Sequence, residues 1–486
     1  MQTHTYSASA SFVSSPSGDP YKYQVGFGNR FASEAIPGTL PQGQNHPQKN
    51  KYGLYMEAMT GSPFITPRPQ NLQAFLYRIR PSLDHKKFVR LPDNPDMESN
   101  FLPINPKVHI SPTQLSFGPP PFPLSSDEVD FIAGLKTIGG NGEPTAREGL
   151  ALHFYVANAD MKNKAFCNSD GDILVAPQQG RLDVQTEFGR MMVRPGEFMV
   201  IQKGMKFRVS LPDGPSRGCD PGQLCSSMSL KLTDSDVQEI FGSHFELPDL
   251  GAIGGQGMAN PRDFEVPLAS FEIGETSWEV VYKIGGQLFS AGQDHTPFDV
   301  VAWQGNYVPY KYAMEKFIFV GSVSKDHIDP SVFTILTAKS KATGIPLVDV
   351  LTLSERWDVA SDTFRPPYYH RNNAAEIVGL IYGEWVPPYV RGGISLQTVF
   401  CPHGPPPEVY KGASTMELKP ERVFKDTLLI GFETPMLTIT DYALNRGGTV
   451  TESEPLSFPP EFIARLEEIN ADLKAAGYDE LKKKSG

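Results

Sequence analysis

The segment Met191-Met-Val-Arg-Pro-Gly-Glu-Phe-Met-Val-Ile201, with Gly204 after it, contains the pattern that decides the fold. An apolar run stands on each side of the Pro195-Gly196 pair, and a further glycine follows the second run. Short apolar runs separated by Pro-Gly turns are the signature of a small antiparallel sandwich or barrel. The segment therefore predicts a small antiparallel β-sandwich or barrel.

Similar runs continue the pattern along the chain. Glycine and proline, 44 of each, make up about 18 % of the 486 residues, against roughly 12 % in average proteins. This excess of turn-forming residues, without a repeat period, favours a mainly β fold. Short β-type runs occupy residues 150–156, 172–176, 180–184 and 186–189, and more aromatic ones occupy residues 300–303, 316–320, 332–336 and 428–432.

The end of the chain has a different period. After Pro459-Pro460, apolar residues recur at helical spacing: Phe462, Ile463, Leu466, Ile469 and Leu473. We expect one amphipathic C-terminal helix, lying on the body or on a neighbouring subunit. The expected division is a flexible N-terminus at 1–20, an N-terminal β-sandwich domain with an irregular wrap at 21–289, a second β domain at 290–458, and the helix and tail at 459–486.

Composition excludes several classes of protein. With 44 basic and 55 acidic residues, the net charge of −11 disfavours a nucleic-acid partner. No run of 18 apolar residues is present, so we expect no membrane-spanning helix. Only four cysteines occur and no secretory pattern is visible at the start, so we expect a cytoplasmic protein.

A candidate metal site lies near the second domain's end. His370 and Glu376, in Tyr369-His-Arg-Asn-Asn-Ala-Ala-Glu376, are six residues apart. An even separation puts both side chains on one face of an extended chain. His403, in Cys401-Pro-His-Gly404, offers a third donor. Two imidazoles and one carboxylate form a facial triad, which suits non-haem Fe(II) and leaves positions open for substrate and O₂.

Other interpretations of these residues stay open. The trio could be a surface histidine with a salt-bridged glutamate, or part of a zinc hydrolase, although no H-E-x-x-H motif is present. Cys401 could act as a nucleophile beside His403. Elsewhere, His153 lies on a predicted strand and is expected to be a packed or hydrogen-bonded residue.

Longer motifs carry a resemblance to a known family. They begin with Gly26-Phe-Gly-Asn-Arg-Phe-Ala-Ser-Glu-Ala-Ile-Pro-Gly38 and continue with Asn168-Ser-Asp-Gly-Asp172, Thr186-Glu-Phe-Gly189, Asp299-Val-Val-Ala-Trp303, Asp326-His-Ile-Asp-Pro330 and Phe364-Arg-Pro-Pro-Tyr-Tyr-His370. On these motifs the chain resembles the homogentisate 1,2-dioxygenases along nearly its whole length.

The resemblance implies a fold and a reaction. The fold would be a cupin-like or jelly-roll β-sandwich in two parts, of which the second binds iron. The reaction would be extradiol-type ring opening of homogentisate by O₂ to 4-maleylacetoacetate, a step of tyrosine and phenylalanine catabolism. The partners would be a small aromatic acid and O₂, and the assembly a homo-oligomer, either a trimer or a hexamer.

The resemblance also implies roles for individual residues. By position, His370, Glu376 and His403 would hold Fe(II), and His327 would be the acid/base histidine that deprotonates the substrate hydroxyl. Substrate contacts would come from Tyr369, Trp385, Arg391, Gln397 and His403.

Several positions depart from the family pattern. Gln304 and Gln397 replace histidines, Trp385 replaces a tyrosine, and a shortened loop ends at Arg391 without the family's lysine. These changes leave two alternatives open: a same-fold dioxygenase for another hydroquinone-like aromatic acid in secondary metabolism, or a catalytically silent metal-binding cupin scaffold. Residues 219–236 form an extra segment, which is either a real surface loop or a gene-model artefact.

Overall fold

The structure is a computed structural model that describes residues 13–14, 18–43, 47–216, 235–249, 259–319, 333–342, 344–358, 365, 368–385 and 390–482. The predicted acid/base residue His327 and most of the extra segment, residues 219–234, lie outside the described residues.

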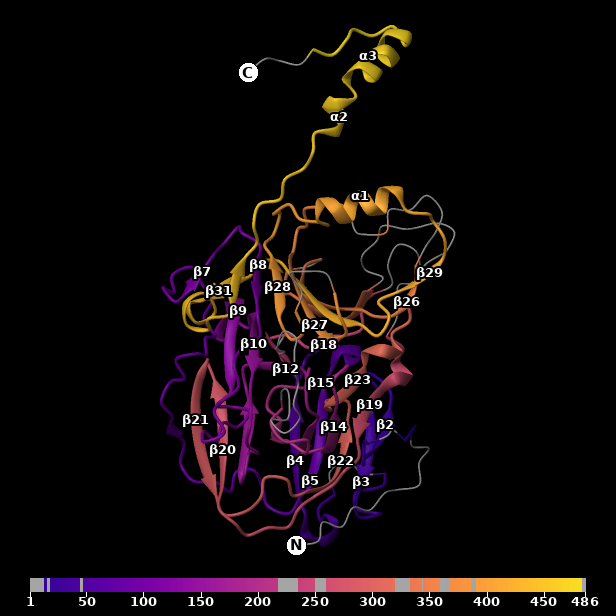
Figure 1. The fold of residues 1–486 in the computed structure, drawn as a ribbon. Helices are drawn as coiled ribbons and strands as arrows, with labels where there is room; N and C mark the ends of the chain where they lie inside the picture. Colours follow the sequence, from indigo (N-terminus) through magenta and orange to yellow (C-terminus); the bar gives the residue numbers. More distant parts are fainter. Residues whose placement is uncertain are drawn as a thin grey trace, which may run out of the picture.

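The predicted mainly β fold is confirmed, and two large sheets form the N-terminal sandwich (Figure 1). The eleven-stranded sheet contains, in spatial order, β1 (Val13–Ser14), β2 (Lys22–Val25), β19 (Phe264–Pro267), β23 (Tyr310–Ala313), β15 (Glu197–Ile201), β12 (Gly171–Ala176), β17 (Ser235–Phe241), β10 (Glu148–Tyr155), β9 (Leu135–Glu143), β31 (Thr438–Thr440) and β7 (Val108–His109). The seven-stranded sheet contains β14 (Gly189–Val193), β13 (Leu182–Thr186), β16 (Lys206–Ser210), β11 (Lys164–Asn168), β20 (Trp278–Ile284), β21 (Gln287–Gln293) and β6 (Val89–Arg90).

The remaining strands form a third large sheet and two small ones. The eight-stranded sheet contains β18 (Phe245–Glu246), β24 (Thr334–Lys339), β25 (Pro346–Leu353), β30 (Leu428–Thr434), β27 (Ala375–Tyr382), β28 (Ile394–Gln397), β8 (Leu115–Phe117) and β32 (Val450–Glu452). A four-stranded sheet contains β3 (Phe31–Glu34), β22 (Val300–Gly305), β5 (Gln73–Arg78) and β4 (Tyr55–Thr60), and β26 (Arg356–Asp358) pairs with β29 (Glu421–Val423). The helices are α1 (Pro407–Thr415), α2 (Glu461–Ala464) and α3 (Leu466–Ala475).

The segment that predicted the sandwich forms its corner. β14 pairs with β13 in the seven-stranded sheet, whereas β15 pairs with β12 and β23 in the eleven-stranded sheet. The Pro195-Gly196 turn, with φ of 92° at Gly196, therefore carries the chain from one sheet to the other.

The two halves of the chain exchange strands. β31 adds to the eleven-stranded sheet beside β9, and β8 adds to the eight-stranded sheet beside β28. β22 and β23, just after residue 290, pair with strands of the first half. The predicted domain division stays a prediction.

Buried charges explain the motif at 168–172, which forms the turn between β11 and β12. Lys283 Nζ, 2 % exposed, donates to Asp170 and Glu239 at 2.9 and 2.8 Å. Asn168 Nδ2 also donates to Glu239, at 2.7 Å. The expected hydrogen-bonded role of His153 is confirmed, because its Nδ1 lies 2.9 Å from Thr137 Oγ1 and its Nε2 3.4 Å from Glu239. Each buried charge has an opposite partner, as burial requires.

Arg78 explains two further motifs. Its buried guanidinium lies 2.9 Å from Glu187 and 2.9 Å from Asp299, which come from the 186–189 and 299–303 motifs. Arg78 belongs to the four-stranded sheet, and Glu187 joins two strands of the seven-stranded sheet. The ion pairs therefore attach the small sheet to the sandwich.

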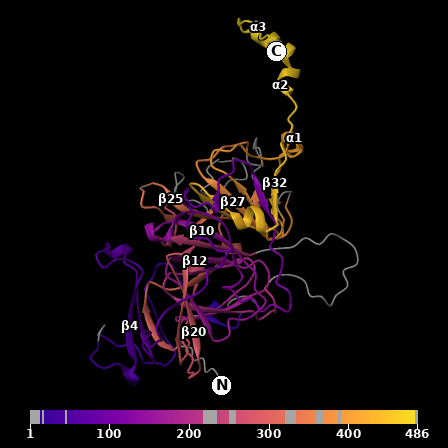
Figure 2. The same ribbon diagram turned by 90° about the vertical axis from the view of Figure 1, so that its left-hand side faces the viewer.

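The C-terminal expectation needs a correction. The predicted single helix is interrupted at Arg465, where φ is −99° and ψ is 14°. It does not lie on the body of its own chain, because α2 and α3 extend away from it in both views (Figures 1 and 2). Phe462 and Ile463 are 60 % and 42 % exposed, so the apolar stripe lacks the packing that stabilises short helices. The strand expected at 316–320 is also wrong where described, since Met314–Lys316 is a 3-10 turn.

His244 generates a prediction about stability. Its Nδ1 lies 2.9 Å from Asp172 Oδ2, and its Nε2 lies 2.7 Å from the Gly61 carbonyl oxygen. Burial lowers the pKa of His244, but Asp172 and the carbonyl oxygen outweigh burial, so its pKa is raised above 6.5. The charged form is therefore favoured in the folded protein. This contribution is complete below the unfolded pKa of about 6.5 and is lost as pH rises through the folded pKa.

We expect His244→Gln to lower the free energy of unfolding by about 1.5–3 kcal/mol at pH 6, because a hydrogen-bonded charge is lost. The difference from wild type should shrink as pH rises through the folded pKa of His244. Denaturant unfolding at pH 6 and at pH 9 measures it, with His85→Gln, at a half-buried histidine that has no carboxylate partner among the described residues, as the control. An equal loss at both pH values would contradict a charged His244.

Candidate metal centre

The two faces of the eight-stranded sheet differ. Val350, Ile377 and Phe432 point into the main hydrophobic core and are at most 2 % exposed. Alternating positions on the same strands are less buried and point the other way, and Glu376 on β27 is one of them. β27 therefore has one face in the core and one face that ligands can reach.

Cross-strand register places a row of polar side chains on the accessible face. Glu376 pairs with Glu433 on one side and with Gln397 on the other, and Glu433 pairs with Asp349. Directly opposed residues of antiparallel strands share a face. Glu376 is thus flanked by a second carboxyl group and by a buried amide.

His370 and His403 are joined through their backbones. His370 N donates to the His403 carbonyl oxygen at 2.9 Å, and His403 N donates to the His370 carbonyl oxygen at 3.1 Å. Each Nδ1 lies near a carbonyl oxygen, of Tyr368 at 2.6 Å and of Cys401 at 3.0 Å. A carbonyl oxygen can only accept a hydrogen bond, so the neutral imidazole carries its proton on Nδ1. Each Nε2 therefore keeps a lone pair for a metal.

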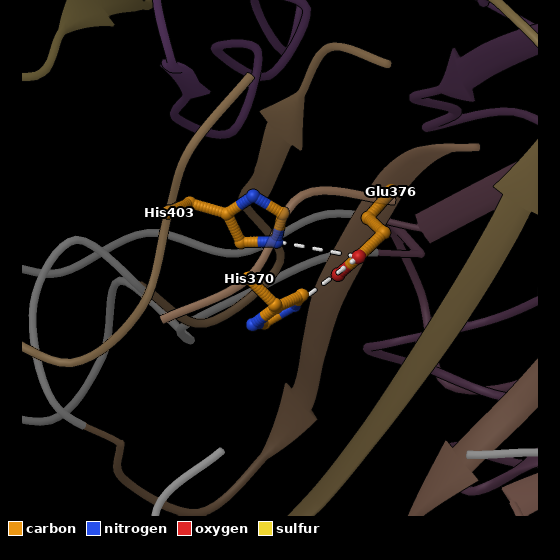
Figure 3. Close-up of side chains that lie close together, drawn as sticks. All are labelled: His370, Glu376 and His403. Atoms are coloured by element: carbon orange, nitrogen blue, oxygen red, sulfur yellow. Dashed lines mark ion pairs between the residues drawn. The ribbon is translucent and has the colours of Figure 1, made fainter. Parts of the chain in front are cut away.

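The three side chains converge (Figure 3). His370 Nε2 and His403 Nε2 lie 3.5 and 3.3 Å from Glu376 Oε1, and the ligand atoms of all three residues lie within 4.8 Å of one another. His403 Nε2 is buried and forms no hydrogen bond of good geometry. Two neutral imidazole nitrogens and a carboxylate, with one buried nitrogen unsatisfied, fit a divalent transition metal.

Electrostatics also suit a cation. Burial raises the pKa of Glu376, but His370 and His403 outweigh burial and lower it to about 2. The hydrogen bond to Glu376 raises the pKa of His370. Burial, with repulsion from Glu376 and Asp349, raises the pKa of Glu433 to about 7. The centre therefore contains an ionised ligand, Glu376, and beside it a second carboxyl group whose ionised form a nearby metal ion would favour.

His370, Glu376 and His403 are brought together by a backbone feature other than the expected alternation along one strand. His370 precedes β27 and forms an isolated bridge with His403, and a bend at residues 373–374 leads into the strand. A bend, and not strand alternation over 370–376, brings His370 to Glu376. The expected set is nevertheless assembled.

The predicted substrate-contact residues lie in different places. Gln397 is 4 % exposed and directly opposite Glu376, and its Oε1 has no hydrogen-bond partner. The Tyr369 ring stacks on Tyr410 at 5.3 Å. Trp385, which stacks on Phe424 at 4.3 Å, follows the far end of β27.

Two other singled-out residues do not reach the centre in this chain. Arg391 Nε donates to the Gly383 carbonyl oxygen at 2.7 Å, beyond the far end of β27. Six strand residues from Glu376 to Tyr382 span about 20 Å. Gln304 lies on β22, in the four-stranded sheet, where it hydrogen-bonds with Tyr77.

Asn372 and Glu433 are neighbours of the centre that the sequence did not reveal. Asn372 Nδ2 donates to Glu376 Oε1. Asn372 is in the segment that carries His370, so its closeness to His370 in the sequence could have identified it as a neighbour of the centre. Glu433 is 57 residues from Glu376, and only the strand register places it there.

Two family models match the chain. One described as "Homogentisate 1,2-dioxygenase N-terminal" matches residues 22–314, and one described as "Homogentisate 1,2-dioxygenase C-terminal" matches residues 315–453. Relatives named homogentisate 1,2-dioxygenase include one from Arabidopsis thaliana, 48 % identical over 80 % of this chain and 81 % of the relative. Another, from Dictyostelium discoideum, is 46 % identical over 87 % and 93 %, and one from Homo sapiens is 42 % identical over 89 % and 94 %.

Among solved structures, the chain is similar to a variant of Bacillus subtilis oxalate decarboxylase. The identity is 11 % and the TM-score 0.26, with 81 % of this chain and 95 % of that chain covered. Within the described residues, no helix has the length and apolar character needed to cross a membrane.

Gly404 generates a prediction for the centre. A Cβ atom at Gly404 would lie 2.6 Å from the Tyr369 ring and 3.0 Å from Tyr369 Cα. We expect Gly404→Ala to displace the segment that carries His370 and to lower the bound metal well below one ion per chain, measured by metal analysis after loading. Gly412→Ala on α1, where nothing lies within 4 Å, is the control. Full metal content in Gly404→Ala would contradict the close approach.

Proposed function

Because this chain belongs to the homogentisate 1,2-dioxygenase family, we propose that it opens the ring of homogentisate with O₂ to form 4-maleylacetoacetate. The observation that carries the proposal is the convergence of His370, Glu376 and His403 on the accessible face of the eight-stranded sheet. Family membership implies a metal-dependent enzyme, and we propose Fe(II) as the metal.

The donor set supports iron. Two imidazoles and one carboxylate on one side of the ion leave positions open on the other, which suits non-haem Fe(II). When bound, Fe(II) would supply these open positions to substrate and O₂ and would allow electron transfer between them. His370, Glu376 and His403 would hold the ion, and the Tyr368 and Cys401 carbonyl oxygens would keep both Nδ1 atoms protonated.

Other residues would orient the substrate. The unpaired amide oxygen of Gln397 is available to accept a hydrogen bond from a ring hydroxyl. Glu433 and Asp349 place two carboxyl groups on the β30 side of Glu376, which favours no second carboxylate there, so the carboxylate of an aromatic acid would point away from that side. We propose that His327 removes the proton of the substrate hydroxyl, on the resemblance alone, since His327 lies outside the described residues.

The chain's small partners are an aromatic acid and O₂, and we propose a homo-oligomer, a trimer or hexamer. Trp385 and Arg391 stay predicted substrate contacts. Trp385 and the guanidinium of Arg391, which donates to Gly383, lie beyond the far end of β27, about 20 Å along the strand from Glu376. They would therefore contact a substrate bound at the metal centre of a second copy of the chain. Cys167 and Cys401 are unbonded, which supports a reducing compartment such as the cytoplasm.

Oxygen uptake tests the function. The anaerobically Fe(II)-loaded protein should consume one O₂ per homogentisate.

Glu376→Ala should lose both iron and activity, because two donors are too few to hold Fe(II). His327→Ala should keep iron and lose about 10²–10⁴-fold in kcat, because a base acts on the substrate. His85→Ala, at a half-buried histidine far in the sequence from the three metal-site residues, is the control. Iron retained by Glu376→Ala would exclude the triad, and iron lost by His327→Ala would exclude the base role.

Gln397 supplies a second test. Gln397→Leu replaces the amide side chain by an apolar side chain of similar size. We expect kcat/KM for homogentisate to fall by about 10–100-fold with iron content unchanged, because a substrate hydroxyl loses its partner. Ser395→Ala, which removes only a weak contact at 3.4 Å, is the control. Unchanged kcat/KM in Gln397→Leu would show that the amide does not contact the substrate.

A further inference from the structure

We propose that Asn372 is a positioning residue of the metal centre, which fixes the orientation of the Glu376 carboxylate. The inference rests on the proposed metal centre and adds a residue that is not itself a ligand. Three observations support it: a side-chain hydrogen bond to Glu376, a backbone hydrogen bond to the segment of His403, and the chemistry of the amide.

The side-chain hydrogen bond comes first. Asn372 Nδ2 donates to Glu376 Oε1. The same oxygen lies 3.5 Å from His370 Nε2 and 3.3 Å from His403 Nε2. A glutamate side chain has three rotatable bonds, and its terminal torsion is broad. A donor attached four residues earlier restricts that freedom and keeps Oε1 at the point where the two imidazoles meet.

The backbone of Asn372 joins the two ligand-carrying segments. Its carbonyl oxygen accepts a hydrogen bond from Phe400 N at 2.8 Å. Phe400 has a φ of 57°, a conformation that reverses the chain shortly before His403. Together with the two backbone bonds between His370 and His403, this bond sets the separation of the histidines. Asn372 thus contacts Glu376 through its side chain and the His403 segment through its backbone.

The amide is the suitable group for this position. It is neutral, so it donates to the carboxylate without placing a further cation beside the metal ion. Donors to a ligand's oxygen orient that ligand, and their loss typically costs about 10–100-fold in metal affinity. Asn373, the next residue, is exposed, whereas Asn372 is half-buried. The chain therefore offers an adjacent residue of the same type for comparison.

The test measures Co(II) binding to the full chain, without substrate, by competition with a chelating dye. Asn372→Leu keeps the side-chain size and removes the donor, and Asn372→Ala removes it without risk of a clash. We expect both variants to bind Co(II) about 10–100-fold more weakly than wild type and to change the visible spectrum of bound Co(II). Asn373→Leu and Asn373→Ala should bind within about twofold of wild type.

The outcomes separate this inference from the proposed function. Wild-type binding that Glu376→Ala abolishes establishes the centre independently of Asn372. If both Asn372 variants then bind Co(II) within twofold of wild type and with its spectrum, the positioning role is overturned. It is also overturned if the unfolding temperature of the metal-free variants falls while that of the Asn373 variants does not, because Asn372 would then serve the fold in general. Failure of wild type to bind Co(II) would overturn the centre and this inference together.

Discussion

The alternation of side chains along β27 is the constraint on which the metal centre depends. Ile377 is fixed in the hydrophobic core, so Glu376 must point to the opposite, accessible face. A shift of one residue in register would exchange the two and remove the carboxylate from the site. The neighbouring strands prevent such a shift, because β27 pairs with β28 on one side and with β30 on the other. The histidines then need only to be brought to the end of one well-fixed strand.

The N-terminal sandwich packs against the core face of β27 and stabilises it, but supplies none of the three metal-site residues. One continuous hydrophobic cluster includes Ile377 and Phe432 of the eight-stranded sheet and Phe154 and Val237 of the eleven-stranded sheet. Gln178 Nε2 also donates to the Ile381 carbonyl oxygen on β27 at 2.8 Å. Buried charge clusters around Lys283 and Arg78 hold the sandwich together. The charged motifs at 168–172, 186–189 and 299–303 are therefore explained by stability, whereas the motif that ends at His370 contributes to the metal centre.

Local patterns were enough to predict the mainly β fold, the turn at Pro195-Gly196 and the three side chains that converge at the candidate metal centre. Contacts between distant segments were not predictable. The pairing of Glu433 with Glu376 depends on strand order, and the pairing of Arg78 with Glu187 and Asp299 depends on how two sheets pack. The apolar residues of the C-terminal helices show a second limit of prediction from sequence. Helical spacing identifies an apolar face, but it does not identify the surface against which that face packs. The substrate contacts of Trp385 and Arg391 were inferred from chain position, and strand length separates them from Glu376 of the same chain.

The central claim is that His370, Glu376 and His403 bind one Fe(II) ion at which homogentisate and O₂ react. Anomalous diffraction at the iron edge, from crystals of the full chain loaded anaerobically with Fe(II), tests the metal part of this claim most directly. We expect one anomalous peak per chain, at bonding distance from both Nε2 atoms and from the Glu376 carboxylate, on the accessible face of the eight-stranded sheet. A peak elsewhere, or the loaded protein showing none at this position, would contradict it.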